Sequence, residues 1–195
     1  MLATAWAMST ARWSLLPFLG VVGALAKETF VPFSIVFCMT WLVMVTRQEG
    51  FRLSRLAGSL LLGISGLVTV TVLQSTISGH LIWPWDILLS RKSGESFFLR
   101  LHEPFLDHSF TYIFVWLLPL GVWHLARLPQ PWVFASAAAA FTAFALGVWQ
   151  ESGPGIGSPV PRAMFNTAGP VLSLSVASLL SKVRLWGGNS PLPSV

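Results

Sequence analysis

The chain has 195 residues, of which 54% are hydrophobic and 10% charged, with a formal net charge of +5. Water-soluble domains carry about 25% charged residues, so this composition excludes a soluble globular domain. The basic residues lie at the ends of apolar runs, where membrane anchoring explains them, and this excludes nucleic acid as the partner of the positive charge. The single cysteine, Cys38, excludes an intrachain disulfide.

Successive apolar runs follow one another along the chain, each about as long as the hydrocarbon core of a bilayer requires. They predict an all-α, polytopic integral membrane protein with about six transmembrane helices, in a single membrane domain covering residues 1–195. The expected spans, in chain order, are 7 or 13 to 26, 30–45, 56–77, 110–126, 132–149 and 163–180.

The turns between these spans fall alternately on two sides of the membrane and differ in charge. One side carries seven Lys and Arg residues with one acidic residue, and the other carries five with six acidic residues. The positive-inside rule counts Lys and Arg and assigns the first side to the cytoplasm. Both termini are then expected in the cytoplasm, and the segment 78–109 is expected outside.

The external segment 78–109 has the composition of a membrane-interface loop. Trp83 and Trp85 stand beside polar residues, as is typical of the headgroup region. The apolar residues further along predict a short helix lying on the membrane. They are Phe97, Phe98, Leu101 and Phe105. A membrane-surface connector and a lid over a lipid-linked ligand both remain open for this segment.

The same segment holds several potential metal ligands, but none with a strong ligand spacing such as His-Glu-x-x-His. They are His80, Asp86, His102, Glu103, Asp107 and His108. We therefore expect neither a metal site nor a bound cofactor. No residue is positioned by the sequence as a catalytic group.

Small residues recur at four-residue spacing in the last two spans. This spacing lets membrane helices approach closely. The two sets are Ala139, Ala143 and Gly147, and Gly169, Ser173 and Ala177. They predict helix packing, either within the bundle or against another subunit.

The polar turn Lys27-Glu28-Thr29 separates two apolar runs. A charged pair at such a place is costly unless it reaches water, headgroups or a cavity. One interpretation is a hairpin turn at the interface. The other is that Lys27 faces a lipid phosphate, with Glu28 fixing its position. Arg162 and Asn166 share a helical face on the same expected side, so these residues are candidates for binding a phosphate at the external leaflet.

Two stretches of the sequence resemble a known class of enzymes. The residues 23–30 resemble a Lys-Glu-Thr turn of polytopic GT-C-type glycosyltransferases, and the residues 162–170 resemble a late segment of related bacterial proteins. These enzymes take a sugar from a polyprenyl-phosphate carrier at the external face. The likeness covers residues 14–181 and is to the carboxyl-terminal part of such enzymes. It implies a bacterial inner membrane and carrier-phosphate contacts at Lys27 and Arg162.

The likeness carries over no catalytic residue. The GT-C catalytic acid lies in the first external loop of a much longer chain, and Glu28 does not match that position. Two functions are therefore left open. The favoured one is a non-catalytic subunit that packs in a larger membrane assembly, because no positioned catalytic group is found. The alternative is a glycosyltransferase-like protein that binds a polyprenyl-phosphate sugar. The expected partners are membrane lipids, other membrane subunits and the polyprenyl-phosphate carrier.

Overall fold

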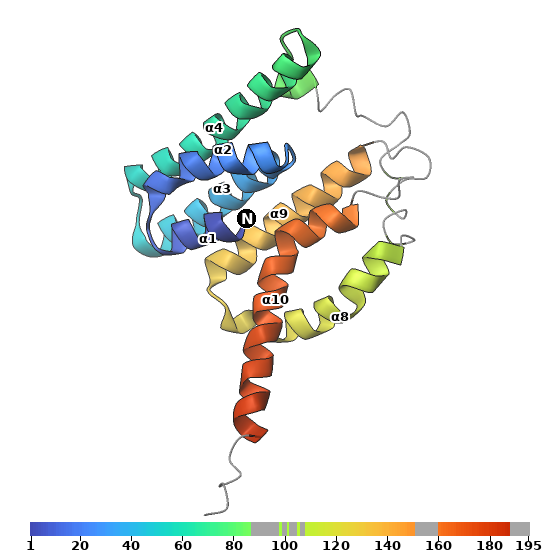
Figure 1. Cartoon of the computed structure of the whole chain (residues 1–195). Coiled ribbons are helices and arrows are strands. Elements are labelled where there is room, and N and C mark those ends of the chain that lie inside the picture. Colours follow the sequence, from blue (N-terminus) through green and yellow to red (C-terminus); the bar gives the residue numbers. More distant parts are fainter. Residues whose placement is uncertain (87–97, 99–100, 102–104, 106–107, 151–159, 188–195) are drawn as a thin grey trace, which may run out of the picture.

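In the computed structural model, residues 1–86, 98, 101, 105, 108–150 and 160–187 are described, and they contain helices and turns but no strand (Figure 1). The elements are α1 (Leu2–Ser9), η1 (Trp13–Leu15), α2 (Leu16–Ala26), α3 (Phe30–Glu49), α4 (Leu53–Ser78), α8 (His108–His124), η2 (Leu125–Arg127), α9 (Gln130–Trp149) and α10 (Val160–Gly187). The expected all-α class is confirmed. Most of the expected surface helix in the segment 78–109 lies outside the described residues.

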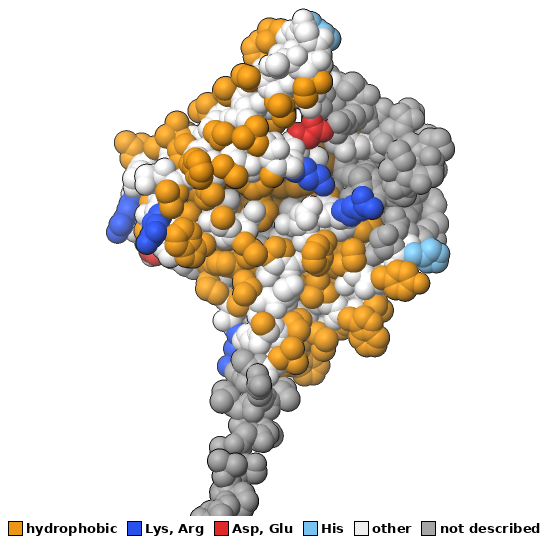
Figure 2. All heavy atoms as spheres, viewed as in Figure 1, with side chains coloured by type: hydrophobic (Ala, Val, Ile, Leu, Met, Phe, Trp, Pro, Cys, Tyr) orange, Lys and Arg blue, Asp and Glu red, His pale blue; other side chains and the backbone are white. Residues whose placement is uncertain are grey.

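Five helical segments are long and apolar enough to cross a bilayer. They are Phe30–Glu49, Leu53–Ser78, Phe110–Arg127, Gln130–Trp149 and Val160–Leu180. They match the last five expected spans and make the chain a polytopic integral membrane protein. Apolar side chains cover much of the face shown in Figure 2. The exposed side chains of α4 include Leu60, Ile64, Val68 and Val72, as expected where hydrocarbon replaces water as the solvent.

The first expected span is different in the structure. Helix α2 has 11 residues, and at 1.5 Å per residue it extends about 17 Å, against about 30 Å of bilayer core. The prediction that this span begins as early as residue 7 is wrong, because Ala7 belongs to the separate helix α1. The chain turns between the two helices at Ala11, which has a φ of 56°, and a left-handed residue ends a right-handed helix.

The helices pack in a sequence that differs from their chain order. Helix α4 contacts α2 and α3, α3 contacts α9, and α10 contacts both α9 and α8. Helix α3 is therefore central, with α2 and α4 on one side and α9 and α10 on the other (Figure 1). The short α1 contributes Ala5, Ala7 and Met8 to a buried cluster with Phe37 and Trp41 of α3.

Glycine sets the closest helix contacts. A Cβ on Gly20 of α2 would clash with the side-chain oxygen of Ser65 and the carbonyl oxygen of Leu62 on α4. The Ser65 hydroxyl donates a hydrogen bond to the carbonyl oxygen of Pro17 at 2.8 Å. Because membrane helices associate through close packing and interhelical hydrogen bonds, these contacts hold the short α2 against the long α4.

Candidate functional site

The turn between α2 and α3 presents Lys27 at the end of the bundle. Helix α2 ends because Lys27 adopts an extended conformation, with φ −163° and ψ 124°. The backbone N–H of Phe30 donates to the carbonyl oxygen of Lys27 at 2.9 Å, which closes the turn. Pro32 then lies in the first turn of α3, where its missing N–H costs no helical hydrogen bond. The side chain of Lys27 is left exposed.

Glu28 is directed to α4 and forms no ion pair with Lys27. Its Oε2 accepts a hydrogen bond from Nε2 of Gln74 at 2.8 Å. Glu28 therefore ties the turn to α4, and our interpretation that Glu28 fixes the position of Lys27 stays a prediction. Among the described residues, the Lys27 ammonium has no hydrogen bond or ion pair, so its charge is available to an anion.

Helix α10 brings Asn166 and Thr167 next to the α2–α3 turn, where they line a pocket together with Lys27. The Thr167 hydroxyl oxygen lies 3.1 Å and 3.0 Å from the carbonyl oxygens of Ala163 and Met164, so it bonds to its own helix. Asn166 is exposed, and the described part of the chain provides no hydrogen-bond partner for its amide. Asn166 therefore keeps both N–H donors for a ligand.

Lys27 and Asn166 line one pocket of about 300 Å³. The hydroxyl of Thr29 adds a further polar group, while Phe30 and Phe33 contribute apolar surface. The pocket therefore combines a free cation and an amide with an apolar wall. This combination suits a ligand that has an anionic group and an apolar part.

Arg162 lies four positions before Asn166 on α10, about 6 Å along the axis, and is exposed. It does not line the pocket. The structure therefore brings Lys27 and Asn166 together. It places Arg162 one helical turn closer to the N-terminus of α10 than Asn166. Arg162 therefore adds a positive charge near the pocket without lining it.

The two sets of small residues have different surroundings. Ala139 and Ala143 of α9 are fully buried, and a Cβ on Gly147 would lie 2.5 Å from the side chain of Val160 on α10. On α10 itself, Ser173 and Ala177 are exposed. The α9 set packs inside the bundle.

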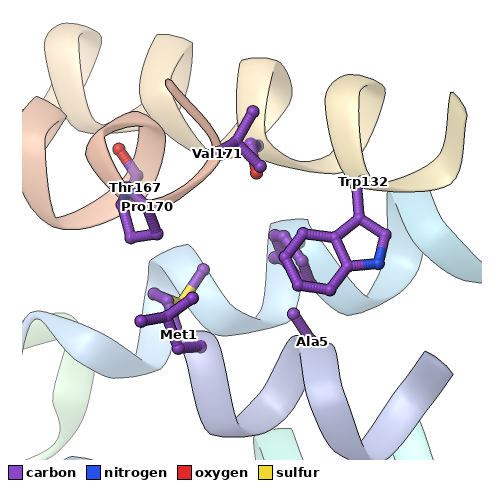
Figure 3. Close-up of a pocket in the computed structure, with 9 residues that line it drawn as sticks. Met1, Ala5, Trp132, Thr167, Pro170 and Val171 are labelled. Carbon is purple, nitrogen blue, oxygen red and sulfur yellow. The ribbon is translucent and has the colours of Figure 1, made fainter. Parts of the chain in front are cut away.

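The second set, Gly169, Ser173 and Ala177, lines a groove of about 760 Å³ between α10 and α1. Adjoining it, a small cavity of about 10 Å³ lies where α1 meets α9 and α10 (Figure 3). A cavity of that size holds one water molecule at most. The groove is therefore much the larger of these two spaces.

The described residues contain no group of three or more His, Cys, Asp or Glu side chains placed to bind a metal. His80 and Asp86 make local contacts, to the carbonyl oxygen of Ser78 and from the N–H of Trp83. His102, Glu103 and Asp107 lie outside the described residues.

The sequence analysis named Thr29 only as part of the polar turn, and it did not predict Gln74 as a site residue. Gln74 has one visible signal, since it is an isolated polar residue near the end of an apolar run. Such residues usually bond a neighbouring helix.

Compared with models of protein families, with curated proteins and with solved structures, the chain matches none. The function must therefore be argued from the geometry of this pocket.

Proposed function

We propose that this integral membrane protein binds the phosphate headgroup of a lipid in the pocket between the α2–α3 turn and α10. The observation that carries the proposal is that Lys27 and Asn166, which are distant in sequence, line the same pocket. The Lys27 ammonium supplies the charge and the Asn166 amide supplies a directed hydrogen bond. Arg162 strengthens the local positive field.

The lipid that we propose is a polyprenyl phosphate. The resemblance to GT-C enzymes supports this choice, since they use that carrier. The charge bias of the turns supports a pocket that opens to the external leaflet of a bacterial inner membrane, with both termini in the cytoplasm. The proposal concerns binding, and it assigns no catalytic group.

The second candidate function is a non-catalytic subunit of a larger membrane assembly. It is favoured by one observation, the exposure of the small residues Ser173 and Ala177 on α10. Small residues on an exposed helix face let a further helix approach. The two functions differ in what remains bound to the protein after gentle extraction.

The test is native mass spectrometry of the protein in dodecyl maltoside micelles, with equal amounts of polyprenyl phosphate and polyprenol. We expect retention of the phosphate and not of the alcohol. Lys27→Gln should reduce retention of the phosphate about tenfold, because a charge-assisted hydrogen bond is lost. Arg47→Gln is the matched control, because Arg47 is an exposed cation near the opposite end of α3.

Equal retention of phosphate and alcohol, or equal losses in the Lys27 and Arg47 variants, would contradict the proposal. Co-purification of other subunits with no bound phosphate lipid would favour the second candidate.

A further inference from the structure

The pocket beside Lys27 and the groove along α10 are neighbours that share lining residues. Met1 and Asn166 contribute to both. One continuous depression therefore runs from the α2–α3 turn along α10. Its polar groups, Lys27, Thr29 and Asn166, gather at one end.

The rest of the depression is mostly apolar and is wide. Leu2 and Ala3 of α1 form one wall, while Phe165 and Leu174 belong to the α10 wall. Between them, Gly169, Ser173 and Ala177 leave space that larger side chains would fill. A polar end followed by an apolar channel matches the shape and chemistry of an amphipathic molecule.

We infer that this groove holds the hydrocarbon tail of the lipid whose phosphate binds beside Lys27. The inference rests on the proposed function and specifies which part of the protein recognises the tail. Charge complementarity at Lys27 fixes the headgroup end, and the shared residue Asn166 makes the groove the continuation of that site.

The length of the groove suits the tail of a lipid in one leaflet. Asn166 and Ala177 are eleven positions apart, which corresponds to about 16 Å along a helix. This is about half of the 30 Å hydrocarbon core, the depth that the tail of a lipid in one leaflet occupies.

The experiment compares the affinities for a long-chain polyprenyl phosphate and for geranyl phosphate, which has the same headgroup and a short tail, in dodecyl maltoside micelles. For the unmodified protein we expect the long chain to bind about tenfold more tightly, because its tail buries apolar surface in the groove. Ser173→Phe should fill the groove, abolish this preference and leave the affinity for geranyl phosphate unchanged. Ala177→Phe gives a second, independent filling of the groove should Ser173→Phe reduce the folded yield.

The matched control is Ala137→Phe, which adds the same side chain at an exposed small residue of α9 outside the groove. Its preference for the long chain should be retained. If the groove variants keep the long-chain preference, or lose it no more than Ala137→Phe does, the inference is wrong although the phosphate site stands. If geranyl phosphate fails to bind and Lys27→Gln changes nothing, the proposed function itself is wrong. Release of a co-purified protein by Ser173→Phe, with lipid affinity unchanged, would assign the groove to a partner helix instead.

Discussion

The two turns at the ends of α3 differ in whether their basic side chain has a partner. At the α3–α4 turn, the buried Arg55 pairs with Glu49 and lies 3.5 Å from the carbonyl oxygen of Gly50. At the α2–α3 turn, Glu28 bonds to Gln74 and the Lys27 ammonium has no partner among the described residues. A cation that is satisfied internally stabilises a turn, whereas an exposed and unsatisfied cation is available to a ligand. Arg55 therefore has a structural role, whereas Lys27 has a charge that a ligand can use.

The largest expected effect is at the α3–α4 turn. Glu49→Ala leaves the buried guanidinium of Arg55 without its counter-ion; because the Glu49 side chain itself is 56% exposed, we expect the free energy of unfolding to fall by about 2 kcal/mol, less than for a fully buried pair. Denaturant unfolding in micelles measures this change. Gln48→Ala, at the exposed neighbouring position, should have little effect. A loss below that of Gln48→Ala would show that the ion pair is not structural.

A smaller loss is expected where the α2–α3 turn is tied to α4. Gln74→Leu removes the hydrogen bond to Glu28 and should lower the free energy of unfolding by about 1–2 kcal/mol, since the bond has a charged acceptor. It should also weaken phosphate binding, because the turn that positions Lys27 loosens. Unchanged binding together with lower stability would mean that Lys27 does not depend on this anchor.

Arg162 should contribute less to binding than Lys27 does. Arg162→Gln is expected to weaken the affinity for a polyprenyl phosphate about threefold, because the side chain lies outside the pocket and acts through a screened field. The loss should shrink further at high salt, as measured by titration at two ionic strengths. An effect equal to that of Lys27→Gln at both ionic strengths would instead make Arg162 a direct ligand.

The smallest effect on stability is expected at Lys27 itself. Lys27→Gln should change the free energy of unfolding by less than about 0.5 kcal/mol, because surface substitutions away from structural contacts are nearly neutral. Thermal unfolding of the Lys27→Gln and Glu49→Ala variants, measured under the same conditions, compares the two losses of stability directly. A loss comparable to that of Glu49→Ala would remove the distinction between the two turns.

Much of the fold could be predicted from the sequence, because a bilayer demands long apolar segments separated by polar turns. The five long spans were anticipated for this reason. The short α2 was not, since its length is set by the turn at Ala11 and by the extended conformation of Lys27. The burial of Arg55 was also missed, because counting charges by side says nothing about which of them pair.

The candidate site could be predicted only in part. Lys27 was conspicuous as a charge between apolar runs, and Asn166 followed from its spacing to Arg162. Whether they meet depends on α10 packing near the α2–α3 turn, a tertiary contact that no local spacing encodes. The contact of Glu28 with Gln74 could not be predicted for the same reason, because Gln74 lies on α4, 46 residues away.

The most direct test of the account is to locate the bound headgroup. A polyprenyl phosphate with a photoreactive group beside the phosphate would be crosslinked to the protein in micelles, and the labelled peptides mapped by mass spectrometry. The account predicts labelling of the α2–α3 turn and of the first turns of α10, reduced in Lys27→Gln and unchanged in Arg47→Gln. Labelling spread evenly over the lipid-facing helices, or insensitive to Lys27→Gln, would contradict it.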